Sequence, residues 1–278
     1  MAAVNVATIL DRTPAPYTPN ADELRARRWL VTGANGSIGT RVVEVLRHAG
    51  AYVFPTDIDY DTGRLDVTDR KQVEYAIEIG NPDIVLHLAG AKHAPLGELD
   101  PMLPSRVHID GTNNVLEAAG RRRVVTASTC KACNPETAYG ASKLIAERLT
   151  LNAGQSVARF HNVVETQGNV FDIWQETPRT DPIDVAPFCS RFFVSLDEAV
   201  GVVLYAALAD SPGRFVANPH KVHNMKHIAD RAYPNRRKRY THERRGDRLA
   251  EPFIASGESA AAEPGVPGIL RVVGKHDA

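Results

Sequence analysis

The sequence predicts an α/β fold, with a Rossmann-type doubly wound parallel sheet and a smaller C-terminal lobe for the substrate. Two observations predict this fold. Strand-like and helix-like segments alternate between residues 28 and 162, and such alternation produces right-handed crossovers with helices on both faces of a parallel sheet. A glycine-rich stretch also stands between the first strand and the first helix, which is where α/β proteins of this kind bind their ligands.

Each element follows from the apolar pattern of its own segment. The run Asp83 to Leu88 (Asp-Ile-Val-Leu-His-Leu) is typical of a strand buried on both faces. In the first helix, Ile38, Val42 and Leu46 lie on one side. The expected strands are 28–32, 51–56, 83–88, 123–127 and 156–160, and the expected helices are 37–48, 70–79, 105–119 and 138–151.

The two ends of the chain and its last third are less regular. Residues 1–27 contain three prolines between positions 14 and 19, and we expect an N-terminal arm rather than a core element. Beyond residue 163 the only convincing helix is 196–208, so residues 163–254 are expected to form a substrate-binding lobe, interleaved with the core, over the carboxyl ends of the strands. Residues 255–278, rich in Ala, Gly and Pro, are expected to be a partly mobile tail.

Composition excludes several functional classes. Lysine plus arginine and aspartate plus glutamate number 33 each, so no net charge recruits nucleic acid or an anionic membrane. No apolar run could span a bilayer and no signal peptide is visible, which predicts a cytoplasmic protein. The three cysteines are an odd number, against a disulfide framework. Cys130 and Cys133 lack the second ligand pair of a zinc site, so we expect no metal.

The glycine-rich stretch has the spacing Gly33-x-x-Gly36-x-x-Gly39. Glycines at such a turn allow close approach of the backbone to a pyrophosphate at the helix N-terminus. Asp57 ends the following strand, where its carboxylate can accept from ribose hydroxyls and repel a 2′-phosphate. Residues 28–162 are therefore predicted to form an NAD-binding Rossmann domain, with NAD favoured over NADP. Asp66 and Val67 are placed either to touch the adenine or to cap the next helix.

The richest stretch for chemistry is Ser128-Thr129-Cys130-Lys131, which is followed by Tyr139-Gly-Ala-Ser-Lys143. A tyrosine and a lysine four residues apart share one helix face, where the ammonium can favour the phenolate. With the hydroxyl of Thr129 upstream, this set predicts removal of a proton from a sugar alcohol.

These motifs make the chain resemble an extended short-chain dehydrogenase/reductase, and most closely the inverting UDP-N-acetylglucosamine 4,6-dehydratases of bacterial polysaccharide synthesis. The likeness runs from about Ile9 to Ile254. Further segments that carry it are Leu86 to Leu96, Ser128 to Pro135, Arg159 to Val164, Ser190 to Phe193 with Leu196 to Val200, and Arg244 to Leu249.

The resemblance implies a redox-neutral reaction on a nucleotide-diphosphate sugar, with UDP-N-acetylglucosamine the first candidate. Tyr139, assisted by Lys143 and Thr129, removes the proton of the 4-hydroxyl while hydride passes to NAD. Lys131 takes the C5 proton, an acid at position 130 helps the C6 hydroxyl leave, and the hydride returns to C6. The residues implied for the cofactor are Gly33, Asn35, Gly36, Ser37, Ile38, Gly39, Asp57, Asp66, Val67, Leu88, Ala89, Gly90, Tyr139 and Lys143. Those implied for the substrate are Lys92, His93, Asn162, Arg191 and Arg244.

Two positions depart from the family pattern. Cys130 stands where the dehydratases have Asp, and His108 stands where they have Asn. A thiol with a pKa near 8.5 can donate a proton but supplies no carboxylate charge at neutral pH. Alternatives therefore stay open: a 4- or 5-epimerase, a 5,6-dehydratase with Cys130 as the acid, or a nucleotide-sugar binding protein without activity. The resemblance also implies a homo-oligomer, first of all a dimer.

Overall fold

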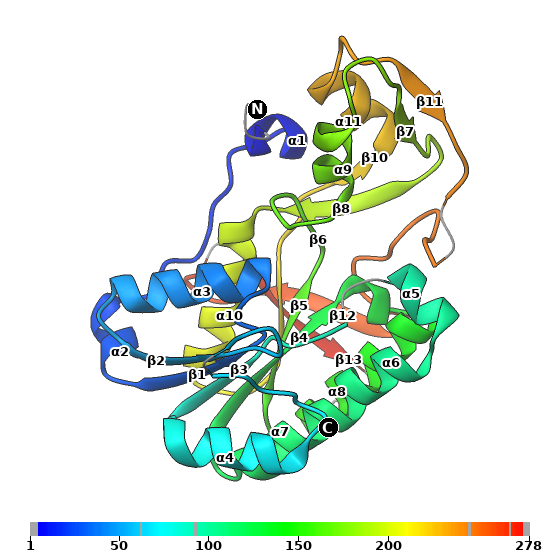
Figure 1. Cartoon of the computed structure of the whole chain (residues 1–278). Helices are drawn as coiled ribbons and strands as arrows, with labels where there is room; N and C mark the ends of the chain where they lie inside the picture. Colours follow the sequence, from blue (N-terminus) through cyan, green and yellow to red (C-terminus); the bar gives the residue numbers. More distant parts are fainter. Residues whose placement is uncertain (1–4, 62, 92–93, 244–245, 267, 275–278) are drawn as a thin grey trace.

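The computed structural model describes residues 5–61, 63–91, 94–243, 246–266 and 268–274. Its centre is an eight-stranded sheet in the order β12-β13-β9-β5-β4-β3-β1-β2 (Figure 1). Within this sheet the six neighbouring strands β9, β5, β4, β3, β1 and β2 pair in parallel. Strand β13 is antiparallel to β9 and to β12. The predicted Rossmann-type α/β fold is thus confirmed.

Three of the parallel strands are buried along their whole length. Every residue of β3, β5 and β9 is buried, as expected for strands that helices cover on both sides. The parallel strands are β1 (Arg28–Thr32), β2 (Tyr52–Thr56), β3 (Ile84–His87), β4 (Arg123–Thr129), β5 (Ser156–Phe160) and β9 (Arg214–Ala217).

Helices cover both faces of this sheet (Figure 1). On one face α3 (Ser37–His48) packs against α10 (Leu196–Leu208), and on the other α4 (Arg70–Gly80) and α8 (Ala138–Asn152) pack against α7 (Gly111–Ala119). The single helix expected over 105–119 is instead three pieces. It comprises α6 (Met102–Ser105), a π-helical turn (Arg106–Asp110) and α7, and such π turns are frequent at functional sites.

A smaller lobe lies beyond the carboxyl ends of the strands (Figure 1). It has a three-stranded sheet and a parallel pair, β7 with β11. The expectation of a single helix in this part of the chain was wrong, because α9 and α11 have only 7 and 8 residues, too few for a clear helical repeat of apolar residues. Its elements are β6 (Asn162–Val163), α9 (Val170–Glu176), β7 (Ile183–Val185), β8 (Ser190–Val194), β10 (Val222–Asn224), α11 (Met225–Ala232) and β11 (Lys238–Tyr240).

The N-terminal arm belongs to the core, contrary to expectation. Helix α1 (Val6–Leu10) packs on α11, and Ile9 and Leu10 are fully buried in the apolar core of the lobe. Helix α2 (Ala21–Arg25) buries Leu24 in the core of the main sheet. Buried leucine and isoleucine side chains on either side of the prolines thus anchor the arm to both parts of the molecule.

Much of the expected tail forms strands of the main sheet. Residues Glu258–Ala262 form β12 and Ile269–Gly274 form β13, and the two strands extend the main sheet beyond β9. Composition misled here because β12 reads Glu-Ser-Ala-Ala-Ala, which has little strand propensity. Pairing with β13 and buried ion pairs of Glu258 hold the segment in the sheet.

Candidate active site

The glycine-rich turn after β1 is packed so tightly that side chains would not fit. Gly33 has a φ of +70°, and a Cβ there would lie 2.5 Å from the amide nitrogen of Ala89. A Cβ on Gly39 would lie 2.1 Å from the carbonyl oxygen of Gly33. Helix α3 starts directly after Gly36, which has no side chain to cap it. The turn therefore presents open backbone N–H groups at a helix N-terminus, as a bound pyrophosphate requires.

Asp57 lies against this turn at the carboxyl end of β2. Its Oδ2 accepts a hydrogen bond from the Asn35 amide (2.9 Å), and its Oδ1 accepts from the Asp59 amide (3.2 Å). The predicted carboxylate and the glycine turn are therefore neighbours, which fits a dinucleotide with its ribose near β2.

Asp66 and Val67 are placed differently from one another. The Asp66 carboxylate accepts from the amide and hydroxyl of Thr68, whereas helix α4 is capped by Asp69. The helix-cap interpretation of Asp66 was therefore wrong. The Val67 side chain is 5% exposed and packs in the core under α4 and α7.

The residues after β3 connect the nucleotide end of the site to its catalytic end. Ala89 donates from its amide to the Thr32 hydroxyl (3.3 Å). At Gly90 a Cβ would lie 3.2 Å from Lys143 Nζ and 3.3 Å from His108 Nε2. A side chain at this position would therefore displace the lysine ammonium and the His108 ring by a few tenths of an ångström. The Leu88 to Gly90 stretch therefore lies between the glycine turn and Lys143.

His108, one of the two departures from the family pattern, ties this loop to α8. Its Nε2 accepts from the Ala91 amide (3.1 Å), and its Nδ1 pairs with the Ser142 hydroxyl (2.8 Å). Its ring meets the Tyr139 ring edge-on at 5.2 Å. Burial, and then the nearby Lys143 ammonium, lower its pKa to about 2, so the ring is neutral and fixes its neighbours rather than exchanging protons.

Tyr139 and Lys143 lie one turn apart on α8. A Cβ on Gly140 would be 2.4 Å from the Lys131 carbonyl oxygen, so α8 begins in tight contact with the segment after β4. Lys143 is 7% exposed and donates to the Ala127 carbonyl (3.0 Å). Burial lowers its pKa to about 8, with Glu147 opposing the shift. Burial raises the pKa of Tyr139, and the Lys131 charge opposes that shift.

Thr129 is the last residue of β4, and its hydroxyl accepts a hydrogen bond from the Lys131 amide (3.3 Å). This contact starts a 3₁₀ turn, Cys130–Ala132, which carries the other two candidate catalytic residues. Thr129, Cys130, Lys131 and Tyr139 thus sit at one junction between β4 and α8.

Glu251 also belongs to this site, and the sequence motifs did not predict it. It is 3% exposed, and its carboxylate pairs with Lys131 Nζ at 2.6 Å. It also accepts from Cys130 Sγ (3.3 Å) and Asn162 Nδ2 (2.7 Å), and lies 3.4 Å from Arg191 Nε. Its only sequence signal is an acid two residues after the Arg244 to Leu249 segment.

These contacts determine the charges in the free protein. Burial would raise the pKa of Glu251, but Lys131 and Arg191 lower it to about 2. Burial would lower the pKa of Lys131, but Glu251 and Cys130 hold it well above its usual range. Burial and the Glu251 charge raise the pKa of Cys130 well above that of an ordinary thiol. The cluster is a carboxylate, an ammonium and a neutral thiol.

The expected substrate residues are only partly brought together. Asn162 and Arg191 meet at Glu251, and Arg191 also donates to the carbonyls of Ser190 (2.9 Å) and Leu249 (3.2 Å). A role of Arg191 at the substrate diphosphate stays a prediction. Lys92, His93 and Arg244 lie outside the described residues.

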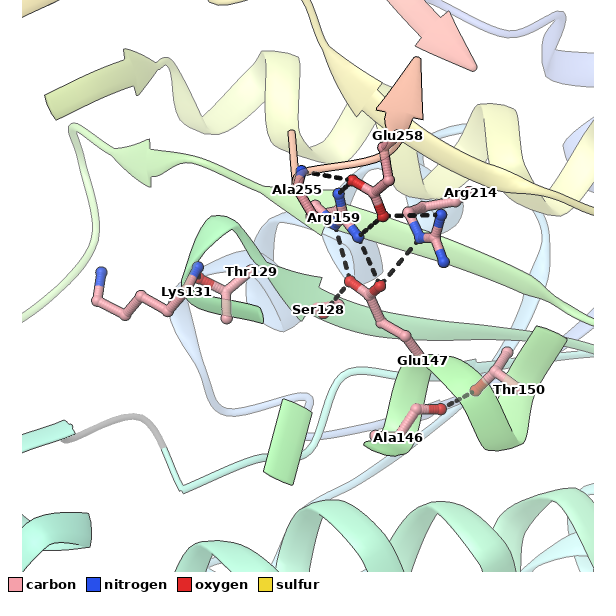
Figure 2. A network of polar contacts seen from close by, with 10 residues as sticks. All are labelled: Ser128, Thr129, Lys131, Ala146, Glu147, Thr150, Arg159, Arg214, Ala255 and Glu258. Carbon is pink, nitrogen blue, oxygen red and sulfur yellow. Dashed lines mark hydrogen bonds and ion pairs between the residues drawn. The ribbon is translucent and has the colours of Figure 1, made fainter. Parts of the chain in front are cut away.

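Behind the catalytic stretch lies a buried network of four charges (Figure 2). Glu147 of α8 contacts Arg159 (2.7 Å) and Arg214 (2.9 Å), and Glu258 of β12 contacts the same two arginines (2.7 and 3.1 Å). Ser128, next to Thr129, donates to Glu147 (2.6 Å). The network therefore joins the helix of Tyr139 to the last strands of the sheet.

The basic run Arg236 to Arg239 is engaged within the lobe. Arg236 donates to the carbonyls of Thr177 and Pro178 (3.0 Å each), and Arg239 pairs with Asp184 (2.6 Å). Among the described residues, no cluster of three or more metal-ligating side chains occurs. In the same part of the chain no helix is long and apolar enough to cross a membrane.

Comparisons with known proteins identify the relatives of this chain. The family described as "Polysaccharide biosynthesis protein" matches residues 57–272. An inverting UDP-N-acetylglucosamine 4,6-dehydratase of Campylobacter jejuni is 32% identical over 70% of this chain and 62% of its own length. A UDP-glucose 4-epimerase of Rickettsia bellii is 27% identical over 84% of this chain and 79% of its own. The chain spans half of a further relative, the probable polysaccharide biosynthesis protein EpsC of Bacillus subtilis.

Solved structures show the same fold at low identity. The protein Pen from Bacillus thuringiensis has a TM-score of 0.76 at 22% identity and covers 92% of this chain and 90% of its own. A Thermus thermophilus UDP-glucose 4-epimerase in complex with NAD has a TM-score of 0.70 at 23% identity, over 82% and 90% of the two chains. The resemblance to extended short-chain dehydrogenases/reductases of polysaccharide synthesis is thereby confirmed.

Proposed function

Because this chain belongs to the polysaccharide biosynthesis protein family, we propose that it is an NAD-dependent nucleotide-sugar dehydratase. UDP-N-acetylglucosamine is the first substrate to test, since the Campylobacter relative is named for that activity. The proposal requires oxidation at C4 of the sugar, proton removal at C5 and elimination at C6.

One observation carries the proposal: the glycine-rich turn, which fits a dinucleotide, lies close to Lys143 on the helix that also carries Tyr139. Gly90 lies between the tight glycine turn on one side and the Lys143 ammonium on the other. The turn fits a dinucleotide, and the Asp57 carboxylate beside it favours NAD over NADP. A bound nicotinamide supplies a reversible hydride acceptor at this place.

The side chains of this protein then have separate roles in moving protons. Tyr139 takes the proton of the 4-hydroxyl, and the Lys143 ammonium on the same helix face favours the phenolate. Thr129 orders the turn that carries Lys131. Once a ketone is at C4, the C5 proton is acidic, and Lys131 is the candidate base.

A second candidate, 4-epimerisation, is favoured by the state of positions 130 and 131. Cys130 is 1% exposed and donates to Glu251, so its proton is directed away from open space. Lys131 is paired as an ammonium ion with Glu251. Neither group is ready for elimination, whereas C4 oxidation and return of the hydride to the other face of the ketone need only Tyr139 and Lys143.

Incubation with NAD and UDP-N-acetylglucosamine in heavy water separates these functions. Loss of water with deuterium at C5 supports the dehydratase. Inversion at C4 with no deuterium at C5 refutes the dehydratase and supports the 4-epimerase. Bound NAD with no reduced nicotinamide and no sugar product refutes both and supports a protein that only binds the nucleotide sugar. Mass spectrometry and proton NMR measure all of these results.

A further inference from the structure

Glu251 joins the lobe to the catalytic stretch of the Rossmann core. Its own segment is held on β8 by the Ser190 amide, which donates to the Leu249 carbonyl (2.7 Å). From there its carboxylate reaches Lys131 (2.6 Å) and Cys130 (3.3 Å), which both follow β4. Its side chain is 1% exposed and that of Lys131 is 18% exposed. Lys131 therefore extends toward open space, while Glu251 lies behind it.

The groups that face Lys131 come from every element packed around it. Cys130 precedes it in the 3₁₀ turn, Tyr139 comes from α8, and Glu251 comes from the segment on β8. His161, after β5, and Arg191, on β8, act on the same cluster through Glu251. Among these five groups Glu251 supplies the carboxylate charge, at direct contact distance. Burial keeps His161 neutral, with its pKa lowered to about 3.

We infer that Glu251 is a positioning residue: it holds Lys131 as an ammonium ion and turns the Cys130 S–H inward. It thereby sets the pH at which a proton leaves C5 of the sugar. This inference rests on the proposed function, because it concerns the step after oxidation at C4.

The nitrogen lone pair of neutral Lys131 takes the C5 proton, and the C5–H electron pair becomes part of the enolate of the 4-ketone. An ammonium ion has no lone pair, so Lys131 must first release one proton to solvent. The fraction of Lys131 that has done so falls tenfold for each unit by which its pKa exceeds the pH.

The resting charge of Lys131 can be measured without activity. The chain has eight lysines, so ¹³C-labelled lysine gives a small set of NMR signals, and Lys131→Arg identifies the signal of interest. We expect Lys131 to stay charged through about pH 10.4, where an ordinary lysine is half titrated. Titration at or below that pH overturns the inference.

Glu251→Gln removes the charge and keeps the size of the side chain. Glu136→Gln is the matched control. Glu136 pairs with Arg248 (2.8 Å), in the same segment as Glu251, but it does not pair with Lys131. We expect Glu251→Gln to lower the Lys131 pKa by about two units. A larger fraction of Lys131 is then neutral, but the less basic amine removes the C5 proton more slowly. The net result should be a rise in deuterium uptake at C5 of about tenfold at pH 7.5.

Oxidation at C4 provides the internal reference. Deuterium uptake is expressed relative to the reduced nicotinamide formed after substrate addition, whose absorbance should stay within about twofold in the control Glu136→Gln because Tyr139, Lys143 and Glu251 are intact there. Slower deuterium uptake with an unshifted pH profile would mean that Glu251 is only structural, and would overturn the inference. If Glu251→Gln does not fold, Glu251→Asp and the titration of the unaltered protein decide.

Failure of the proposed function gives a different pattern. No reduced nicotinamide together with an unchanged sugar in the unaltered protein refutes oxidation of this sugar at C4. The NMR titration of Lys131 in the unaltered protein and in Glu251→Gln still supports or overturns the charge assignment.

Discussion

Replacing Glu258 by glutamine tests whether the end of the chain holds the catalytic framework together. Glu258 accepts hydrogen bonds from Arg159 (2.7 and 2.9 Å) and from the Ala255 amide (2.7 Å), and it pairs with Arg214 at 3.1 Å. Both arginines are at most 1% exposed, and Glu147 is the second carboxylate they share (Figure 2). Glu258→Gln leaves two buried guanidinium ions with one carboxylate.

The expected loss is about 3–5 kcal/mol of unfolding free energy, as for other buried pairs that lose one partner. The pKa of Glu258 gives an independent figure. Burial would raise that pKa, but Arg159 lowers it from 4.5 to about 2. This shift corresponds to about 3 kcal/mol at neutral pH. Removing the partner thus costs a large part of the stability of an ordinary domain.

The same pKa predicts the pH dependence. Because the folded-state pKa is below the unfolded one, the contribution is complete above pH 4.5 and is lost as the pH falls toward about 2. The unaltered protein should therefore lose stability more steeply than Glu258→Gln across that interval.

Urea unfolding followed by circular dichroism, at pH 7 and at steps down to pH 3, measures both effects. Glu74→Gln is the control, since the Arg70–Glu74 pair is exposed (61% and 49%) and such pairs contribute under about 1 kcal/mol. A loss in Glu258→Gln no larger than in this control would refute the reasoning, as would identical acid profiles of the two proteins.

Three further substitutions test the site. Gly39→Ala should abolish NAD binding in calorimetry, because its Cβ would lie 2.1 Å from the Gly33 carbonyl oxygen; unchanged affinity contradicts the described turn. Tyr139→Phe should reduce C4 oxidation at least about a hundredfold in stopped-flow absorbance, since the proton acceptor is lost; a rate within tenfold assigns the proton to another group. Cys130→Asp should increase water loss from the sugar, because the new carboxyl next to Glu251 must keep a proton at neutral pH; Cys130→Ser is the control, and equal water loss in both variants excludes position 130 as the acid.

The sequence predicted those features that depend on neighbours along the chain. Alternation placed the strands of the Rossmann sheet, and the glycine spacing placed the turn next to Asp57. The four-residue spacing of Tyr139 and Lys143 placed both on α8.

Features that depend on distant partners could not be predicted in this way. Glu251 meets Cys130 across 121 residues, and Glu258 meets Arg159 across 99 residues. An isolated acid in a polar segment gives no sign of an arginine or lysine that the fold brings to it. The π turn around His108 could not be predicted either, because its backbone hydrogen bonds span one residue more than those of a regular helix and leave no mark in the apolar pattern.

The place of β12 and β13 affects how the protein folds as it is synthesised. Residues 258–274 leave the ribosome after all the other strands of the main sheet. Until then β9 is an open edge, and Arg159 and Arg214 lack the Glu258 carboxylate. Open edges pair readily with other chains. A nascent chain that has made the whole catalytic stretch but not residues 258–274 therefore has an incomplete sheet, whose open edge makes it prone to aggregate until β12 and β13 dock.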